Sequence, residues 1–284
     1  MVIDLHTHST ASDGSEAPDR IAELAASAGC MAVALTDHDS FAGLPSASAR
    51  AGELGLTFVP GCEVSCRAER PDGSTASAHV LAYFAERAGP LAAELLLLQQ
   101  DRTTRNRRLA ERLAELGIPV TFEEVVERAG KEEGVGRPHF AALLVEKGAA
   151  TSIQNAFDEW LAAGRPAYVP KARIAPEDVA GLARDSGGVA VLAHPLSLGL
   201  DARALGTFVR RLARAGFGGI EAMYAGYTPG ERETLAELAR EVGLVPTGGS
   251  DFHGAFKPDL QVGSGRGDLD VPDWVLDELM DRRP

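Results

Sequence analysis

"VIDLHTH" (residues 2–8) is a short apolar run that ends on two histidines, His6 and His8. The run has the length of a strand, and side chains at positions i and i+2 of a strand lie on the same face. We therefore expect His6 and His8 to share one face at the C-terminal end of a strand. The rest of the chain repeats this combination of an apolar run with a polar end.

Six further runs have the same character. They are rich in Val, Ile, Leu and Ala and alternate only weakly, which is typical of strands buried on both faces of a parallel sheet. They span residues 31–38, 56–65, 77–84, 188–195, 218–224 and 244–253. Amphipathic helical patterns that end at glycine follow most of them, in residues 18–29, 41–55, 176–187, 204–216 and 231–243. Repeated strand–helix units predict an α/β fold, either a barrel or an open doubly wound sheet.

The alternation is interrupted once. From about residue 90 to residue 168 the pattern is helical, and no strand-like run of comparable strength occurs there. We interpret residues 91–168 as a helical insertion or cap. Residues 1–90 and 169–284 would then form the α/β body that carries the site.

Composition limits the classes of function. The 284 residues are 45% hydrophobic and 24% charged, as in ordinary globular proteins. No apolar run approaches the roughly 20 residues of a membrane helix, and the polar N-terminus predicts no secretory signal. The formal net charge of −13 argues against a surface for long duplex nucleic acid, because phosphates are bound by Lys and Arg. Three cysteines, an odd number, suggest reduced thiols in a cytoplasmic protein.

The histidines are placed unusually. Of the seven, five lie at or just past the C-terminal end of a predicted strand: His6, His8, His38, His194 and His253. Glu63 and Asp251 lie at such ends too, whereas His79 comes early in its strand. In parallel barrels these ends meet at the active site. A single histidine at a strand end is usually a packing residue, but so many at one rim, with carboxylates between them, predict a metal centre.

Mixed imidazole and carboxylate ligands favour Mn, Zn or Fe over Mg or Ca, which prefer oxygen-only ligands. With Asp13, which follows the first two histidines in a loop, the candidate ligands outnumber the four that one tetrahedral zinc uses. The sequence therefore predicts two or three divalent ions bridged by a carboxylate such as Glu63 or Asp251. Closely spaced metals provide a bound hydroxide at neutral pH and stabilise the oxygens of an in-line displacement, which is the chemistry of phosphoester hydrolysis.

Six motifs, in order, resemble those of the polymerase and histidinol phosphatase (PHP) family. They are "DLHTHSTASDG" (4–14), "ALTDHDS" (34–40), "GCEVS" (61–65), "HVLAYF" (79–84), "LAHP" (192–195) and "GSDFHG" (249–254). The resemblance covers the chain outside the helical insertion. It implies a distorted (β/α)7 barrel with a trinuclear metal centre, for which we expect manganese, with zinc or iron as alternatives.

The resemblance also implies a ligand set. His6 and His8 would bind one metal, and Glu63 would bridge it to a second metal held by His79 and His194. Asp13, His38 and His253 would bind the third, and Asp251 would join the first and third. Some family members carry histidine where this chain has Asp13. The resemblance leaves Asp37 to orient a ligand. We expect Glu63 and Asp251 to be essential for catalysis, and His194 or a metal-bound water to protonate the leaving alkoxide.

The helical insertion resembles that of one branch of the family. This branch contains phosphatases of nucleoside 3′,5′-bisphosphates and 5′-to-3′ exonucleases of short oligonucleotides. "DRTTRNRR" (101–108) and "GRPHF" (136–140) are similar to that branch, and they supply Arg102, Arg105, Arg137 and His139 as candidates for binding substrate phosphates. Arginines on a helix are also common on solvated faces, paired with glutamates such as Glu111.

Two alternatives stay open at this point. A histidinol-phosphate phosphatase would use the same metal rim, although a basic insertion favours a nucleotide or a short oligonucleotide as substrate. A metal-stabilised module without activity is the other alternative, and the complete set of ligand positions argues against it. The sequence indicates no oligomeric state.

Overall fold

The computed structural model describes residues 2–70, 73–85, 87–132, 134–170 and 173–284. Within these ranges, seven strands form one sheet in which neighbours along the chain are neighbours in space. The strands are β1 Ile3–Asp4, β2 Ala32–Leu35, β3 Thr57–Glu69, β4 Thr75–Tyr83, β5 Val189–Leu192, β6 Gly219–Tyr224 and β7 Val245–Gly249. The amide of Leu5 donates to the carbonyl of Gly248, 3.2 Å away, so that the first and last strands meet and the sheet nearly closes into a barrel. The predicted α/β barrel is confirmed.

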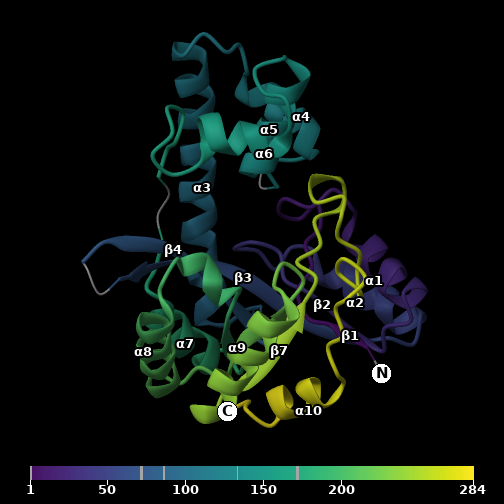
Figure 1. Ribbon diagram of the computed structural model, residues 1–284. Coiled ribbons are helices and arrows are strands. Elements are labelled where there is room, and N and C mark those ends of the chain that lie inside the picture. The colour runs from purple at the N-terminus through teal and green to yellow at the C-terminus, as the bar shows by residue number, and fades with distance from the viewer. Residues whose placement is uncertain (1, 71–72, 86, 133, 171–172) are drawn as a thin grey trace.

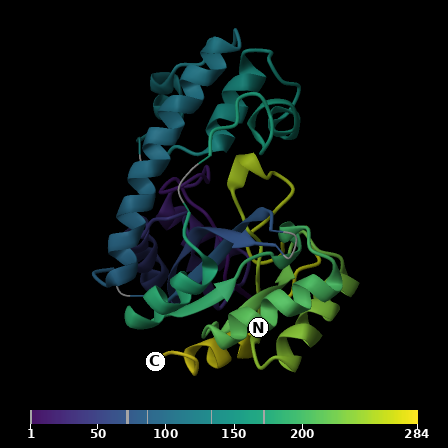
Figure 2. The same cartoon turned by 90° about the vertical axis from the view of Figure 1, so that its left-hand side faces the viewer.

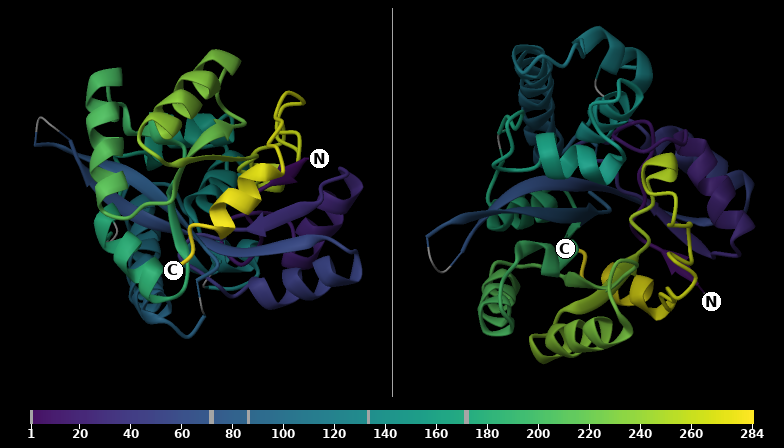
Figure 3. Two further views of the ribbon diagram at one scale, coloured as in Figure 1. Left: turned by 90° about the horizontal axis from the view of Figure 1, so that it is seen from below. Right: turned by 45° about the horizontal axis from the view of Figure 1, so that its top comes forward.

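Helices surround the outside of this barrel (Figures 1 and 3). They are α1 Pro18–Ser27, α2 Leu44–Glu53, α7 Pro176–Asp185, α8 Ala202–Arg214, α9 Pro229–Glu241 and α10 Trp274–Met280. The helix signals in the sequence explain their ends. Thr228 and Glu231 form a capping box before α9, and Gly243 follows the helix with a φ of 74°, which a residue without Cβ adopts readily. The short α10 had no counterpart among the predicted helices.

The direction of one strand differs from the parallel arrangement that the sequence predicted. β4 is antiparallel to both β3 and β5, whereas the other neighbouring pairs are parallel. Parallel neighbours need a crossover of a dozen or more residues. Here the chain turns back at once, and the amide of Arg70 donates to the carbonyl of Ser74 at 2.8 Å. The N-terminal part of β4 therefore lies at the end of the barrel where the parallel strands finish.

The first apolar run also forms less strand than expected, because β1 covers only two residues of the predicted 2–8. Beyond it the backbone pairs with the segment after β7. The amide of Asp251 donates to the carbonyl of His6, and the amide of His8 donates to the carbonyl of Phe252, at 2.8 and 2.9 Å. This extended contact fixes the first and last metal-ligand candidates against each other.

One long helix starts beside the barrel and extends beyond it, and three shorter helices and a π-helical turn lie next to its far part (Figures 1 and 2). They are α3 Pro90–Glu115, α4 Phe122–Ala129, α5 Arg137–Glu146, α6 Ile153–Ala156 and the turn Phe157–Leu161. Leu91 and Leu95, near the start of α3, belong to a core cluster of the barrel. Leu109 and Leu113, farther along, pack with Phe140 in a separate cluster of the helical region. α3 therefore joins two hydrophobic cores.

Cys30, Cys62 and Cys66 are buried and form no disulfide. Within the described ranges, none of the helices combines the length and the apolar character needed to cross a membrane.

Candidate active site

Glu63 lies at the centre of the histidine rim, and its side chain is buried. Its Oε2 is 3.3 Å from His6 Nε2, 3.1 Å from His8 Nε2 and 3.2 Å from His38 Nδ1. One carboxylate oxygen thus faces three imidazole nitrogens that come from two different strand ends.

The second oxygen of Glu63 faces the other side of the rim. Glu63 Oε1 is 2.8 Å from His79 Nδ1 and 2.9 Å from His194 Nε2. His79 pairs in register with Ser65 of β3, and it joins the rim because β4 is antiparallel. The early position of this histidine in its strand is thereby explained.

Asp251 and Asp13 lie on either side of His253. Asp251 Oδ1 is 3.3 Å from His253 Nδ1 and 3.4 Å from His8 Nε2. Asp13 Oδ1 is 3.5 Å from His253 Nε2, and its Oδ2 is 3.8 Å from His38 Nε2. All nine residues proposed as metal ligands from the sequence therefore gather in one place.

These side chains fit a group of divalent cations. Potential ligand atoms lie within 4.8 Å of one another in three sets: His8, Asp13, His38 and His253; His6, His8 and Asp251; and His38, Glu63 and His79. The Nδ1 atoms of His8 and His38 and the Oδ1 of Asp13 are buried and form no hydrogen bond within the described residues. All three lie 3.2 to 3.9 Å from a group that can carry the opposite charge, which is close enough for an ion pair but without the geometry of a hydrogen bond. Buried polar atoms without a hydrogen bond are costly, and a bound cation would satisfy these three.

The carboxylates are in the charge state that metal binding requires. Burial opposes ionisation of Glu63, but His38, His79 and His6 together hold the pKa of its carboxyl group well below the usual range. For Asp13, burial is likewise outweighed by His38 and His253, and the pKa of this carboxyl group is also low. Both groups are therefore anionic at neutral pH, as a carboxylate must be to bind a cation.

Glu221, which the sequence reasoning did not select, holds two of these histidines in place. Its Oε1 is 2.8 Å from His6 Nδ1, and its Oε2 accepts a hydrogen bond from the backbone amide of His194 at 2.8 Å. His194 has a φ of 26°, a strained conformation for a residue with a side chain. The sequence offered one signal for Glu221, namely a single glutamate inside the apolar run of β6. A carboxylate that is fully buried, as this one is, needs a charged or hydrogen-bonding partner.

Asp37, expected to orient a ligand, forms its hydrogen bonds within the described residues with the loop between His8 and Asp13 and not with a histidine. It accepts hydrogen bonds from the backbone amide and hydroxyl of Ser9, both at 2.8 Å, and from the hydroxyl of Ser12 at 2.7 Å. These contacts fix the loop that carries Asp13.

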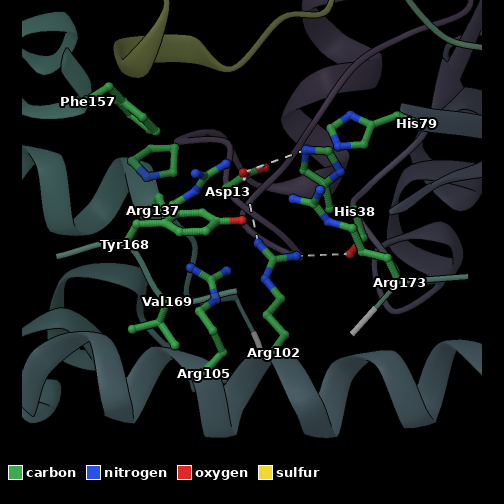
Figure 4. A pocket seen from close by; sticks show the side chains of 11 residues that line it. Asp13, His38, His79, Arg102, Arg105, Arg137, Phe157, Tyr168, Val169 and Arg173 are labelled. Carbon is green, nitrogen blue, oxygen red and sulfur yellow. Dashed lines mark hydrogen bonds and ion pairs between the residues drawn. The ribbon is translucent and has the colours of Figure 1, made fainter. Parts of the chain in front are cut away.

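A small cavity rich in arginine lies beside the metal-ligand candidates (Figure 4). Its volume is about 110 Å³, and it is lined on the barrel side by Asp13, His38 and His79. The remaining lining residues are Arg102, Arg105, Arg137, Pro138, Phe157, Tyr168, Val169 and Arg173. Four arginines against one aspartate make this cavity strongly positive in a chain whose net charge is −13.

Contacts with the barrel position part of this cavity. Arg102 donates from Nε to the carbonyl of Val135 and from Nη1 to the carbonyl of His38, at 3.0 and 3.3 Å. A Cβ atom at Gly136 would lie only 2.7 Å from Asp13 Cβ, so the start of α5 approaches Asp13 this closely because residue 136 is glycine. The helical region is thus fixed against the loop that carries Asp13.

Arg105 is a buried cation of this cavity that lacks part of its hydrogen bonding. Its side chain is buried, and its Nε has no hydrogen-bond partner within the described residues. Burial, together with Arg137 and Arg102, lowers the pKa of its guanidinium to about 9. Such a group is stabilised by an anion, and guanidinium geometry suits the oxygens of a phosphate. Sequence reasoning proposed Arg105 for this purpose but missed Arg173 and Tyr168, because neither stands near a recognisable motif.

His139 occupies a different position from the one expected. It is buried and lines neither of the two described cavities next to the metal-ligand candidates. Its Nδ1 accepts the backbone N–H of Gly136 at 3.0 Å, at the N-terminus of α5. Burial lowers the pKa of His139 to about 4, so the ring is neutral at pH 7 and carries no charge for a phosphate. We assign it a positioning role for the loop that carries Gly136.

This pKa predicts an acid dependence of stability. Between pH 7 and pH 5 the unfolded chain binds a proton at His139 near pH 6.5, whereas the folded chain binds it only near pH 4. The free energy of unfolding should therefore fall by about 2 kcal/mol over this interval through this residue alone. Urea unfolding of metal-free protein measures it, and H139N, which keeps an acceptor for Gly136, should lack that part of the pH dependence. Equal pH dependence of the two proteins would contradict the assignment.

A second, larger cleft opens on the other side of the metal-ligand candidates. Its volume is about 520 Å³. It shares His38 and His79 with the arginine cavity and is also lined by Glu63, His194, Leu196, Ser197, Tyr224, Gly226, Tyr227, Glu231, Asp251, His253 and Lys257. The hydroxyl group of Tyr224 donates to Asp251 Oδ2 at 2.7 Å, and Lys257 Nζ lies 2.5 Å from the same oxygen. The candidate metal centre thus lies between a small cationic cavity and a wider cleft.

Comparisons with known proteins agree with this geometry. The model of the PHP domain matches residues 4–130. The 5′-3′ exoribonuclease Rnm of Escherichia coli (strain K12) is 35% identical over 257 residues, which are 89% of this chain and 85% of that protein. The 3′,5′-nucleoside bisphosphate phosphatase of Chromobacterium violaceum is 32% identical over 92% of this chain and 90% of its own length. A solved structure of an amidohydrolase from C. violaceum, with bound sulfate and no metal, has a TM-score of 0.88 at 32% identity and covers 99% of this chain and 97% of that one.

Proposed function

The chain belongs to the PHP family and is a hydrolase of phosphoester bonds, and on this premise we propose that it removes the 3′-phosphate of nucleoside 3′,5′-bisphosphates. We further propose two or three divalent ions as its cofactor, with manganese first and zinc or iron as alternatives. Residues 91–168 would act as a cap that supplies the binding site for the second phosphate. Three unpaired cysteines favour a cytoplasmic location.

The observation that carries the substrate proposal is the cavity of four arginines next to the metal-ligand candidates. A volume of about 110 Å³ is well below the roughly 300 Å³ at which pockets for drug-sized ligands begin, so it suits a phosphate group without its nucleoside. A substrate with one phosphate at the metal ligands and a second in the cavity satisfies both sets of groups. A phosphomonoester would leave Arg105 without a partner.

The rim residues and the arginines of the cavity would have different tasks. Metal ions held by the rim would supply an activated water and neutralise charge on the phosphate oxygens. Arg102, Arg105 and Arg137 would hold the other phosphate, and so orient the nucleoside and its scissile bond. His194 is better placed as a ligand than as the acid for the leaving oxygen, because its Nε2 faces Glu63 and its Nδ1 lies 3.0 Å from Ser197 Oγ.

A panel of substrates tests this proposal. Phosphate release by manganese-supplemented enzyme should be fastest with adenosine 3′,5′-bisphosphate and at least about tenfold slower, in kcat/KM, with AMP or histidinol phosphate. Histidinol phosphate also contains a cationic amine, which the arginine cavity would repel. Faster turnover of histidinol phosphate than of the bisphosphate would overturn the proposal. Absence of activity in fully metal-loaded protein would favour a non-catalytic module.

A further inference from the structure

One set of metal-ligand candidates lies against the helical insertion. The potential ligand atoms of this set lie within 4.8 Å of one another, and its members are His8, Asp13, His38 and His253. Asp13, His38 and His253 belong to three different segments of the barrel. Contacts with the insertion hold each of these segments.

The turn that carries His38 is held by the long helix α3. Gln99 donates from Nε2 to the carbonyl of Asp39 at 2.8 Å, next to the contact of Arg102 with the carbonyl of His38. Asp39 has a φ of 52°, a conformation that costs energy in a residue with a side chain and persists only where its surroundings fix it. The amide of Asp39 donates to the carbonyl of Glu63 at 3.0 Å. The turn is therefore held by α3 on one side and by β3 on the other.

The segments of Asp13 and His253 contact the insertion as well. Arg102 Nη2 lies 3.9 Å from Asp13 Oδ2 (Figure 4). Three residues beyond His253, the ring of Phe256 meets the ring of His139 edge-on, with their centroids 5.0 Å apart. His139 is on α5, so two helices of the insertion take part in these contacts.

Other ligand candidates are supported from the barrel instead. Glu221 of β6 contacts the ring of His6 and the backbone amide of His194, and Tyr224 at the end of β6 donates to Asp251. The supports of the metal-ligand candidates thus come from two parts of the chain. The set around Asp13 and His38 is the one that depends on the insertion.

Resting on the metal cofactor of the proposed function, we propose that the insertion completes the binding position of one metal ion, and that Gln99 is a positioning residue for it. This ion, called the cap-side ion below, is the one whose candidate ligands are His8, Asp13, His38 and His253. Residues that orient metal ligands contribute about 10- to 100-fold to metal affinity. Gln99 acts on one ligand of four, through the backbone, so its contribution lies near the lower end of this range.

Q99M and Q100M, at neighbouring positions of α3, form a matched pair. Gln100 is exposed, and methionine keeps the length of either side chain but removes its donor. Equilibrium dialysis against manganese, read by elemental analysis, should show the cap-side ion bound about tenfold more weakly in Q99M than in the wild type or Q100M. The other ions should bind as before. Phosphate release by Q99M should need about tenfold more manganese for its half-maximal rate and should recover at saturating manganese.

A second variant shows whether Gln99 acts through this ion. D13N removes a ligand of the cap-side ion and should lose it, and Q99M/D13N should bind the remaining manganese as D13N does. A further loss in the double variant, equal manganese binding by Q99M and the wild type, or an unchanged metal content in D13N would overturn the proposal.

Two further measurements separate the possible failures. The unfolding temperature of metal-free Q99M should lie within about 4 °C of the wild-type value, as expected for loss of one hydrogen bond. A larger fall, with turnover that manganese does not restore, would make Gln99 structural and overturn the proposal. The binding measurements contain no substrate, so slow hydrolysis of adenosine 3′,5′-bisphosphate would refute the proposed substrate alone. A wild type that binds no manganese would refute the metal centre and this proposal with it.

Discussion

E63Q should lower phosphate release from a nucleoside bisphosphate by more than about a hundredfold and should also lower the metal content of the protein. Loss of a residue that only supports a metal ligand costs about 10- to 100-fold in activity or metal affinity. Glu63 is proposed as a ligand itself, so its loss should cost more. Its two oxygens face five imidazoles at 2.8 to 3.3 Å, so no other single carboxylate in the described rim reaches as many of the ligands. Glutamine keeps the volume of the side chain but removes its charge.

Two measurements separate this effect from damage to the fold. Elemental analysis by mass spectrometry gives the metal content, and thermal unfolding of the metal-free protein reports stability. E69Q is the matched control, because Glu69 is exposed on the same strand, β3. A full metal content and normal turnover in E63Q would contradict the assignment of Glu63 as the bridging ligand.

The strands were predictable because their signals are local: each run is apolar and is bounded by polar or turn residues. These signals left a barrel and an open sheet as alternatives, and only the resemblance to the PHP family implied the barrel that the structure shows. The direction of β4 was not predictable from its composition, because buried strands of either orientation have the same residues. The short separation of the two strands decides it, because Glu69 of β3 already pairs with Thr75 of β4, and the polar residues between them gave no sign of this pairing.

The ligand candidates were predictable for a different reason. Strand ends of one sheet converge, so the positions of His6, His38 and Asp251 at such ends carried three-dimensional information. Groups that act on these ligands from the middle of a strand gave a weaker signal. Glu221 is an example. The sequence shows only one polar residue in an apolar run, and its contacts with His6 and His194 become visible only in the structure.

The arginine cavity shows the limit of pattern reasoning most clearly. Arg105 and Arg108 are both on α3 within one short basic stretch, yet Arg105 is buried and Arg108 is exposed. Only the packing of the π-helical turn and of Tyr168 over α3 distinguishes them. Arg173 follows the helical region in sequence and reaches the same cavity, a contact that no spacing along the chain indicates.

R105M should separate activity from stability. Removing a buried cation that has an anionic partner only in the complex should lower kcat/KM for adenosine 3′,5′-bisphosphate by about a hundredfold or more, the usual cost of losing one member of a buried charge pair. Hydrolysis of p-nitrophenyl phosphate, which has no second phosphate, should change by less than about twofold. Steady-state kinetics with both substrates give the two values.

The stability of the free enzyme should change in the opposite direction. Burial and the neighbouring arginines oppose the charge on Arg105, which is why its pKa is only about 9. Replacing a buried, poorly compensated charge by an apolar side chain of similar length is often neutral or stabilising. We therefore expect R105M to unfold at the same temperature as the wild type or higher, and inorganic phosphate to stabilise the wild type more than R105M. R108M, on the exposed face of α3, should change none of these quantities. If R105M lowered both substrates' turnover and the unfolding temperature together, the side chain would be structural and the cavity would need another explanation.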